Sequence, residues 1–283
     1  MYRAKAEGRH TVRHFSPEMD QALQARRVLA LDLERALRME EFELFYQPIV
    51  NIVTEEVIGF EALLRWWHPE QGLILPSEFI SLAEEKGFIL VLGEWVLRRA
   101  CRDAAEWPTP LTVSVNLSAL QLRSAKLVRT IVHALSESGL AVGRLMLEIT
   151  ESVLLQKDTA STANLAQLKN LGVAIAMDDF GTGYSSLSTL HRFSFDKIKI
   201  DRSFVHDLPE GSSAIAIVRS VTSLAKSLGI GVTAEGVETR AQLQLLRAEG
   251  CHEAQGYLFG PPRPANELAE ILAHRKQWDV AAA

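Results

Sequence analysis

The segment VAIAMDDFG at residues 173–181 joins a short apolar run to two adjacent carboxylates and a glycine. A short apolar run that ends in a turn signal is typical of a buried β-strand. Seven of eight strand-like segments carry a polar side chain at or near their end: Glu61, Asn116, Glu148, Asp178 with Asp179, Lys199, Glu235 and Gln255. Polar side chains at one end of many strands predict a barrel whose rim is an active site. Carboxylates gathered there repel one another and are expected to hold cations or share protons.

Helical patterns alternate with these strands along the chain. The predicted strands cover residues 43–49, 57–64, 111–117, 145–149, 173–177, 197–200, 231–234 and 255–259. The predicted helices cover residues 18–40, 76–86, 94–106, 125–137, 159–171, 184–192, 213–228, 240–249 and 265–274. Ser77 is a candidate N-cap, and helices are expected to end at Gly87, Gly139, Gly172, Gly229 and Gly250. This alternation predicts a parallel sheet with enough units to close.

The first two predicted strands break the alternation. Only about seven residues centred on Thr54 separate them, whereas a parallel crossover needs about a dozen or more. The first pair is therefore expected to be an antiparallel hairpin. The sequence predicts an α/β fold, a TIM-type (β/α)8 barrel with its first strand antiparallel.

The composition bounds the class of protein. Hydrophobic residues make up 47% and charged residues 23% of the 283 residues, as in ordinary globular proteins. A net charge of −5 gives no general attraction for a nucleic-acid polymer or an anionic membrane. Cys101 and Cys251 show no zinc spacing and indicate free thiols in a reducing compartment. With no apolar run near the roughly 18 residues of a membrane span and no signal peptide, we expect a cytoplasmic domain without membrane contact.

Several candidate site residues also have simpler interpretations. Asp178 and Asp179 could bind metal ions, or could cap the helix that follows. Glu61 and Arg65 are four residues apart, so they share one side of a strand and could bind a metal and a phosphate, or form a salt bridge. Lys199 in a barrel interior is costly unless it meets anions. A nucleophilic Ser or Cys with a base partner is not evident, which disfavours covalent catalysis.

Three further residues need context. Taken singly, Asn116 and Glu148 are typical of turn residues or helix caps rather than ligands. Glu151, three residues after Glu148, is expected to face the opposite way and to brace the following loop through hydrogen bonds.

In their order along the chain, these motifs resemble the EAL-domain family of cyclic di-GMP phosphodiesterases. The resemblance covers roughly residues 34–265. It rests on eight motifs: Tyr46-Gln47-Pro48, Glu61-Ala62-Leu63, Val115-Asn116-Leu117-Ser118, Glu148-Ile149-Thr150-Glu151, residues 178–186, Lys199-Ile200-Asp201, Ala234-Glu235-Gly236-Val237-Glu238 and Gln255-Gly256-Tyr257. Each motif alone is weak, but eight in order at strand ends are specific.

The resemblance implies a metal-dependent hydrolysis of cyclic di-GMP to linear 5′-pGpG, with two Mg²⁺ or Mn²⁺ ions in each active site. It assigns catalysis to Lys199, Glu235, Glu61 and Glu151. It assigns metal binding to Glu61, Asn116, Glu148, Asp178, Asp179 and Glu235. It assigns substrate contacts to Gln47, Arg65, Asp201, Glu238 and Gln255. Ca²⁺ is expected to inhibit, because its longer bonds and looser geometry should not align the attack.

The resemblance also implies a domain organisation and partners. Residues 1–30 are similar to the end of a GGDEF-like domain and a linker helix, residues 31–275 to the phosphodiesterase barrel, and residues 276–283 to a tail. The expected partners are cyclic di-GMP, a second copy in a homodimer formed near residues 178–186, and upstream GGDEF and sensory domains, which could carry a membrane anchor. The alternatives are a cyclic di-GMP sensor without turnover, and a phosphodiesterase for another substrate.

Overall fold

A computed structural model of the protein describes residues 17–108, 110–151, 153, 158–181, 190 and 193–273. Eight strands close into a barrel in the order β1-β2-β4-β5-β6-β7-β8-β9, with β9 pairing back to β1. These strands are β1 (Phe42–Asn51), β2 (Val57–His68), β4 (Thr112–Asn116), β5 (Leu145–Thr150), β6 (Ala174–Phe180), β7 (Lys197–Ile200), β8 (Gly231–Ala234) and β9 (Glu253–Gln255). The short strands β3 (Gly72–Ile74) and β10 (Arg263–Pro264) extend the pairing of β2 and β1.

The first strand runs against its neighbours, as its spacing predicts. β1 pairs antiparallel with both β2 and β9, whereas the steps from β2 through β9 are parallel. The connection after Asn51 is a tight turn in which the Asn51 side chain accepts the backbone N–H groups of Val53 and Thr54. The predicted fold class, a TIM-type barrel with a reversed first strand, is confirmed.

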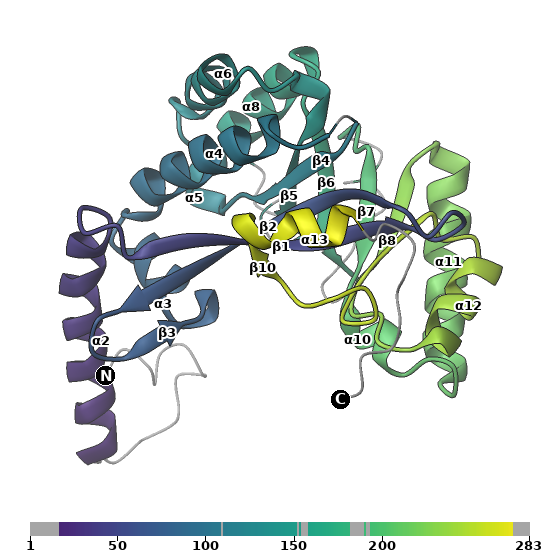
Figure 1. The fold of residues 1–283 in the computed structure, drawn as a ribbon, viewed down its shortest axis with the longest axis horizontal. Helices are drawn as coiled ribbons and strands as arrows, with labels where there is room; N and C mark the ends of the chain where they lie inside the picture. Colours follow the sequence, from purple (N-terminus) through teal and green to yellow (C-terminus); the bar gives the residue numbers. More distant parts are fainter. Residues whose placement is uncertain are drawn as a thin grey trace.

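Helices cover the outside of the barrel, with α4, α6 and α8 over one flank and α11 and α12 over the other (Figure 1). The α-helices are α2 (Pro17–Ala36), α3 (Pro76–Glu85), α4 (Ile89–Ala105), α5 (Ala119–Leu122), α6 (Leu127–Ser138), α8 (Thr159–Asn170), α10 (Arg202–His206), α11 (Ser212–Leu228), α12 (Arg240–Ala248) and α13 (Leu268–Ala273). The 3-10 helices are η1 (Val142–Arg144) and η2 (Ala265–Glu267).

Helix starts differ from the predictions more than helix ends. The five predicted terminal glycines all have positive φ, so those helix ends are confirmed. Ser77 is not an N-cap: α3 begins at Pro76, and the Glu78 carboxylate accepts the backbone N–H of the N-cap residue, Leu75. α4 begins at Ile89 rather than at residue 94, because apolar residues of its first turn are buried in the core.

Some predictions lie outside the described residues. These are residues 1–16, most of the predicted helix 184–192, residues 182–186 of the loop expected near a dimer contact, and the tail at 276–283. Within the described part of the chain, none of the helices combines the length and the apolar character needed to cross a bilayer.

The last barrel strand is shorter than predicted and ends, rather than begins, at Gln255. The backbone leaves the strand because it is held against the loop after β8: the Gln255 carbonyl accepts the Val237 N–H, and the Val237 carbonyl accepts the Leu258 N–H. A Cβ on Gly256 would lie 2.2 Å from the Val237 carbonyl oxygen, so this close approach needs a glycine. Gln255 therefore shares the rim with the other strand ends.

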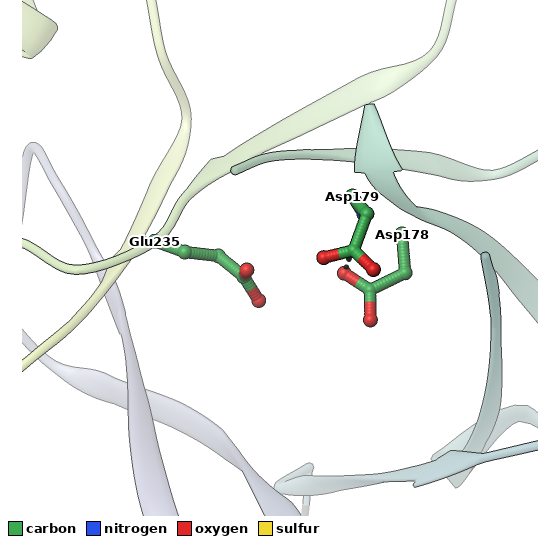
Figure 2. A group of neighbouring side chains, drawn as sticks. All are labelled: Asp178, Asp179 and Glu235. Atoms are coloured by element: carbon green, nitrogen blue, oxygen red, sulfur yellow. Dashed lines mark hydrogen bonds between the residues drawn. The ribbon is translucent and has the colours of Figure 1, made fainter. Parts of the chain in front are cut away.

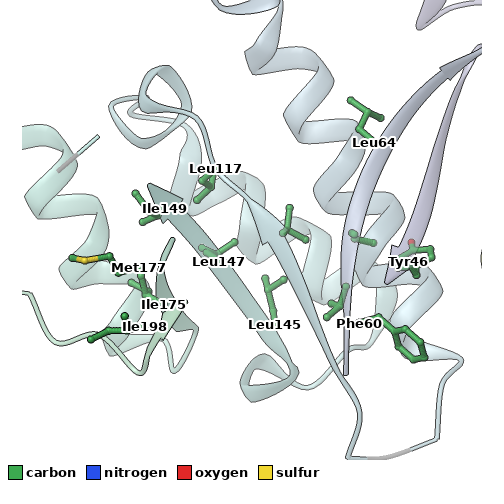
Figure 3. Packing of buried hydrophobic residues seen from close by; sticks show 14 of the residues in the cluster. Tyr46, Phe60, Leu64, Leu117, Leu145, Leu147, Ile149, Ile175, Met177 and Ile198 are labelled. Carbon is green, nitrogen blue, oxygen red and sulfur yellow. The ribbon is translucent and has the colours of Figure 1, made fainter. Parts of the chain in front are cut away.

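Successive side chains of a strand point alternately to the apolar core and to the site. On β5, Leu145, Leu147 and Ile149 are fully buried among apolar side chains, as Figure 3 shows. Glu148 lies on the other face of the strand, because successive side chains of a strand point to opposite faces. The apolar core between barrel and helices therefore fixes the strands that present the polar side chains.

Helix α2 is attached to the far end of β2. His68, the last residue of β2, lies 3.2 Å from the Asp32 carboxylate, and its Nδ1 accepts the backbone N–H groups of Glu70 and Gln71. The ring is therefore protonated at Nε2 and donates to Asp32. An exposed Arg26–Glu85 pair at 2.7 Å joins α2 to α3.

The parallel junction of β2 and β4 gives a prediction about stability. Gly59→Ala would place a Cβ 2.2 Å from Thr112 Oγ1 and 2.7 Å from the Thr112 carbonyl oxygen. We expect a loss of about 1–3 kcal/mol in the free energy of unfolding, measured by urea denaturation. Gly143→Ala is the control, because its Cβ would meet no atom within 4 Å. Equal stability of the two variants would contradict this close approach of β2 and β4.

Candidate active site

The rim of the barrel brings four carboxylates to one ammonium group. Lys199, on β7, is 1% exposed. Its Nζ lies 2.5 Å from Glu148 on β5, 2.6 Å from Glu235 after β8, 3.4 Å from Glu61 on β2 and 3.5 Å from Asp178 on β6. Residues predicted from five separate strands thus meet at one point, and Lys199 meets the anions that its burial requires.

A β-bulge places Asp179 beside Asp178. Neighbouring side chains of a regular strand point to opposite faces, so two adjacent aspartates could not serve one site. The register of β6 with β7 shifts between Met177 and Phe180, and Asp179 has a φ of 55°. A bulge of this kind re-aims a side chain and is common next to active sites. Figure 2 shows the carboxylates of Asp178, Asp179 and Glu235 turned toward one another.

Amide side chains hold Glu61 in place. Its carboxylate accepts hydrogen bonds from Asn116 at 2.7 Å and from Gln255 at 2.6 Å. Gln255 also donates to the Gln47 side-chain oxygen at 2.9 Å, and Gln47 donates to the Gly260 carbonyl. Predicted metal-binding and substrate-binding residues therefore form one hydrogen-bonded chain across β1, β2, β4 and β9.

The carboxylates of the site outnumber its positive groups. Burial and neighbouring charges shift the pKa values of these carboxylates. Burial raises the pKa of Glu148 well above its usual range, with Lys199 opposing and Glu61 and Asp178 adding to the rise. Burial likewise raises the pKa of Glu235 to about 8. Burial would also raise the pKa of Glu61, but Lys199, Gln255 and Asn116 together keep it below its ordinary value. Added cations would relieve this crowding.

The neighbouring carboxylates also shift the pKa values of Asp179 and Lys199. Burial and the neighbouring Asp178 raise the pKa of Asp179. Burial lowers the pKa of Lys199, but the surrounding carboxylates outweigh it and hold that pKa well above its usual value. These carboxylates therefore favour the cationic form of Lys199.

The donor set fits a hard divalent cation. Ligand oxygens of Asp178, Asp179 and Glu235 all lie within 4.8 Å of one another. Oxygen donors of this kind suit Mg²⁺, Mn²⁺ or Ca²⁺ rather than soft metals. The cluster could therefore hold a metal ion, with Glu61, Glu148 and Asn116 beside it.

The other predicted site residues lie around this centre. Arg65 stacks over the Phe45 ring, 5.4 Å from its centroid, and donates to the Leu64 carbonyl. Asp201 caps α10 by accepting the Ser203 N–H. Glu151 directly follows β5 and is 3% exposed. Their roles toward substrate or loop stay predictions.

A cavity of about 270 Å³ opens beside the carboxylates. It is lined by Gln47, Glu61, Leu63, Asp178, Arg202, Glu235, Gly236, Glu238, Gln255, Gly256 and Tyr257. Arg202 and Tyr257 were not among the predicted site residues; the position of Arg202 directly after the Lys199-Ile200-Asp201 motif was the available signal. A larger, mainly apolar cavity of about 610 Å³ between β2, α3, α4 and α5 borders the site through Asn116 and is unsuited to cations.

The buried ammonium leads to a stability prediction. Lys199→Met would leave the surrounding carboxylates without their positive partner, so we expect a loss of about 3–5 kcal/mol, measured by urea denaturation in chelator. Lys197→Met is the matched control on the same strand: Lys197 pairs with Glu253 at 2.5 Å and is more exposed. If Lys199→Met costs no more than Lys197→Met, the carboxylates do not depend on Lys199.

Comparison with known proteins agrees with this geometry. Residues 30–262 match the family described as EAL domain. The chain is 43% identical over 277 residues to MucR of Pseudomonas aeruginosa, a bifunctional diguanylate cyclase/cyclic di-GMP phosphodiesterase, with 96% of this chain and 40% of MucR covered. It is 42% identical over 276 residues to the cyclic di-GMP phosphodiesterase NbdA of the same organism, with 96% and 35% covered.

A solved structure described as the PaMucR phosphodiesterase in complex with c-di-GMP is similar with a TM-score of 0.81 and 45% identity. That comparison covers 85% of this chain and 99% of the other. The chain spans only 35% to 40% of the length of NbdA and MucR. Since the family covers most of the chain and the fold agrees, the protein belongs to the EAL domain family.

Proposed function

We propose that this protein hydrolyses cyclic di-GMP to linear 5′-pGpG as a metal-dependent phosphodiesterase. The observation that carries the proposal is the meeting of Glu61, Glu148, Asp178, Asp179 and Glu235 around Lys199. The names of MucR and NbdA support the choice of substrate.

Charge explains why cations belong to this reaction. Cyclic di-GMP carries two phosphodiesters, and a rim of carboxylates would repel them. Glu61, Asn116, Glu148 and Asp178 would hold one divalent ion, and Asp178, Asp179 and Glu235 would reach a second. Bound Mg²⁺ or Mn²⁺ would supply Lewis-acid activation of water and neutralise the phosphate.

The protein's own side chains orient the reactants. Lys199 Nζ, fixed by the surrounding carboxylates, donates a hydrogen bond to the attacking water or to a phosphate oxygen. The hydrogen-bonded Gln47 and Gln255 place amide groups at the cavity wall, where they can bind the edge of a guanine. Arg65, Asp201 and Glu238 complete the proposed substrate contacts.

The same proposal covers the organisation of the longer protein. We place the catalytic domain at residues 31–275, with the part of α2 before residue 31 as the end of a linker from upstream GGDEF and sensory domains. The partial coverage of MucR and NbdA supports such additional domains. We also propose a homodimer formed near residues 178–186.

The proposal is tested by incubating the purified chain with cyclic di-GMP. We expect pGpG, detected by chromatography, with Mg²⁺ or Mn²⁺, and none in excess chelator; Ca²⁺ should inhibit. Asp178→Ala and Glu61→Ala should each abolish turnover while the thermal unfolding transition persists, because rim residues contribute less to stability than the core.

The outcomes separate the alternatives. Full turnover in chelator would refute the metal assignment. Binding of cyclic di-GMP without product under all metal conditions would identify a sensor module instead. Hydrolysis of another phosphodiester, with cyclic di-GMP neither bound nor cleaved, would refute the proposed substrate.

Glu151→Ala gives a separate prediction about the bulge. Thr150, the residue before Glu151, pairs with Asp178, so the buried Glu151 lies next to the β6 end that carries Asp179. Loss of its carboxylate should lower the rate, and higher metal concentration should partly restore it. The exposed Glu137→Ala is the control. A Glu151→Ala enzyme with parental rate and metal dependence would exclude a positioning role.

A further inference from the structure

The cavity beside the carboxylates has a strongly asymmetric charge. Four carboxylates line it, those of Glu61, Asp178, Glu235 and Glu238. Among the described residues that line it, Arg202 carries the one positive charge. An anionic ligand that enters this cavity therefore meets one wall that attracts it without help from a metal.

The backbone holds Arg202 at this position. Gly236, between Glu235 and Val237, has a φ of 69°, and a Cβ built on it would lie 2.6 Å from the Arg202 Cβ. The loop after β8 therefore packs directly on the first residue of α10. Because Glu235 and Gly236 are adjacent, this contact fixes the stem of Arg202 next to the metal-binding carboxylates.

The Arg202 guanidinium is available to a ligand. The side chain is exposed, and within the described part of the chain it forms no ion pair. Arg65, the other arginine near the site and itself a proposed substrate contact, lies over the Phe45 ring, donates one N–H group to the Leu64 carbonyl and does not line this cavity. A guanidinium presents several N–H groups in a plane and suits bidentate contact with a phosphodiester.

We propose that Arg202 binds the phosphate of the cyclic dinucleotide that is not being cleaved. This inference rests on the proposed function. The cleaved phosphate would lie at the carboxylate cluster, where bound cations would neutralise it, and Arg202 would give the second phosphate a separate positive partner in the same cavity. Arg202 thereby favours substrates with two phosphates over those with one.

The first experiment measures binding without turnover. Cyclic di-GMP is titrated calorimetrically in excess EDTA into the parent, Arg202→Ala, Arg202→Lys and Arg129→Ala proteins. We expect Arg202→Ala to bind about 10-fold more weakly and Arg202→Lys to lie between, because Lys keeps the charge but not the planar fork. Arg129→Ala, an exposed arginine of α6, should bind like the parent.

The second experiment separates phosphate recognition from a general structural effect. With Mg²⁺, Arg202→Ala should raise KM for cyclic di-GMP about 10-fold with a much smaller change in kcat. For bis(p-nitrophenyl) phosphate, which has a single phosphodiester, the loss in kcat/KM should be several-fold smaller. Equal losses for the two substrates would overturn the proposal.

The outcomes distinguish this inference from the proposed function. If the parent binds and cleaves cyclic di-GMP but Arg202→Ala binds it like Arg129→Ala, the role of Arg202 is refuted while the function stands. If the parent binds in EDTA without cleaving it in Mg²⁺ and Arg202→Ala binds more weakly, the Arg202 contact is supported and the proposed hydrolysis is refuted. A parent that neither binds nor cleaves it refutes both.

Discussion

The mutual dependence of Lys199 and the carboxylates around it is the constraint on which the site depends. A buried ammonium is costly without anions, and crowded carboxylates are costly without cations. Neither can be removed without leaving an unbalanced buried charge. One lysine does not match Glu61, Glu148, Asp178, Asp179 and Glu235. Burial raises the pKa values of Glu148 and Glu235, and neighbouring carboxylates add to the rise. The site is therefore arranged to take up further positive charge.

A closed barrel is a direct way to assemble such a group. Apart from Asp178 and Asp179, which share β6, each charged side chain comes from a different strand or strand end, and each strand is held by apolar side chains on its opposite face. Because every barrel strand pairs with a neighbour on each side, electrostatic repulsion at the rim is opposed by the whole core rather than by one loop. The bulge at Asp178 and Asp179 departs from regular pairing where two neighbouring carboxylates are needed.

Local patterns in the sequence were sufficient to predict most of the fold. The seven-residue gap after the first strand was sufficient to predict the antiparallel hairpin, because chain length limits the connection. Strand-end polar residues were sufficient to predict Glu61, Glu148, Lys199 and Glu235 at one rim, because parallel strands share an end. The site residues that follow from resemblance alone, such as Asp201, keep their predicted roles untested.

Features that the sequence did not predict arose where distant segments decide the local structure. Gln255 ends its strand because Val237, far away in sequence, binds the backbone there. The placement of Arg202 depends on the close approach of Gly236 in a similar way. The orientation of Asp179 depends on a register shift that no alternation rule contains. Periodicity within a segment holds no information about such contacts.

Strand β2 has a consequence beyond its own residues. One continuous strand carries Glu61 at the reaction centre and His68 at the contact with α2. Between these two ends β2 pairs with β1 from Glu61 to Trp66, and this pairing couples the positions of the two ends. Thermodynamic linkage then works in both directions. A change that shifts the docking of α2 through β2 alters the free energy of ligand binding. Ligand binding in turn alters the free energy of α2 docking by the same amount.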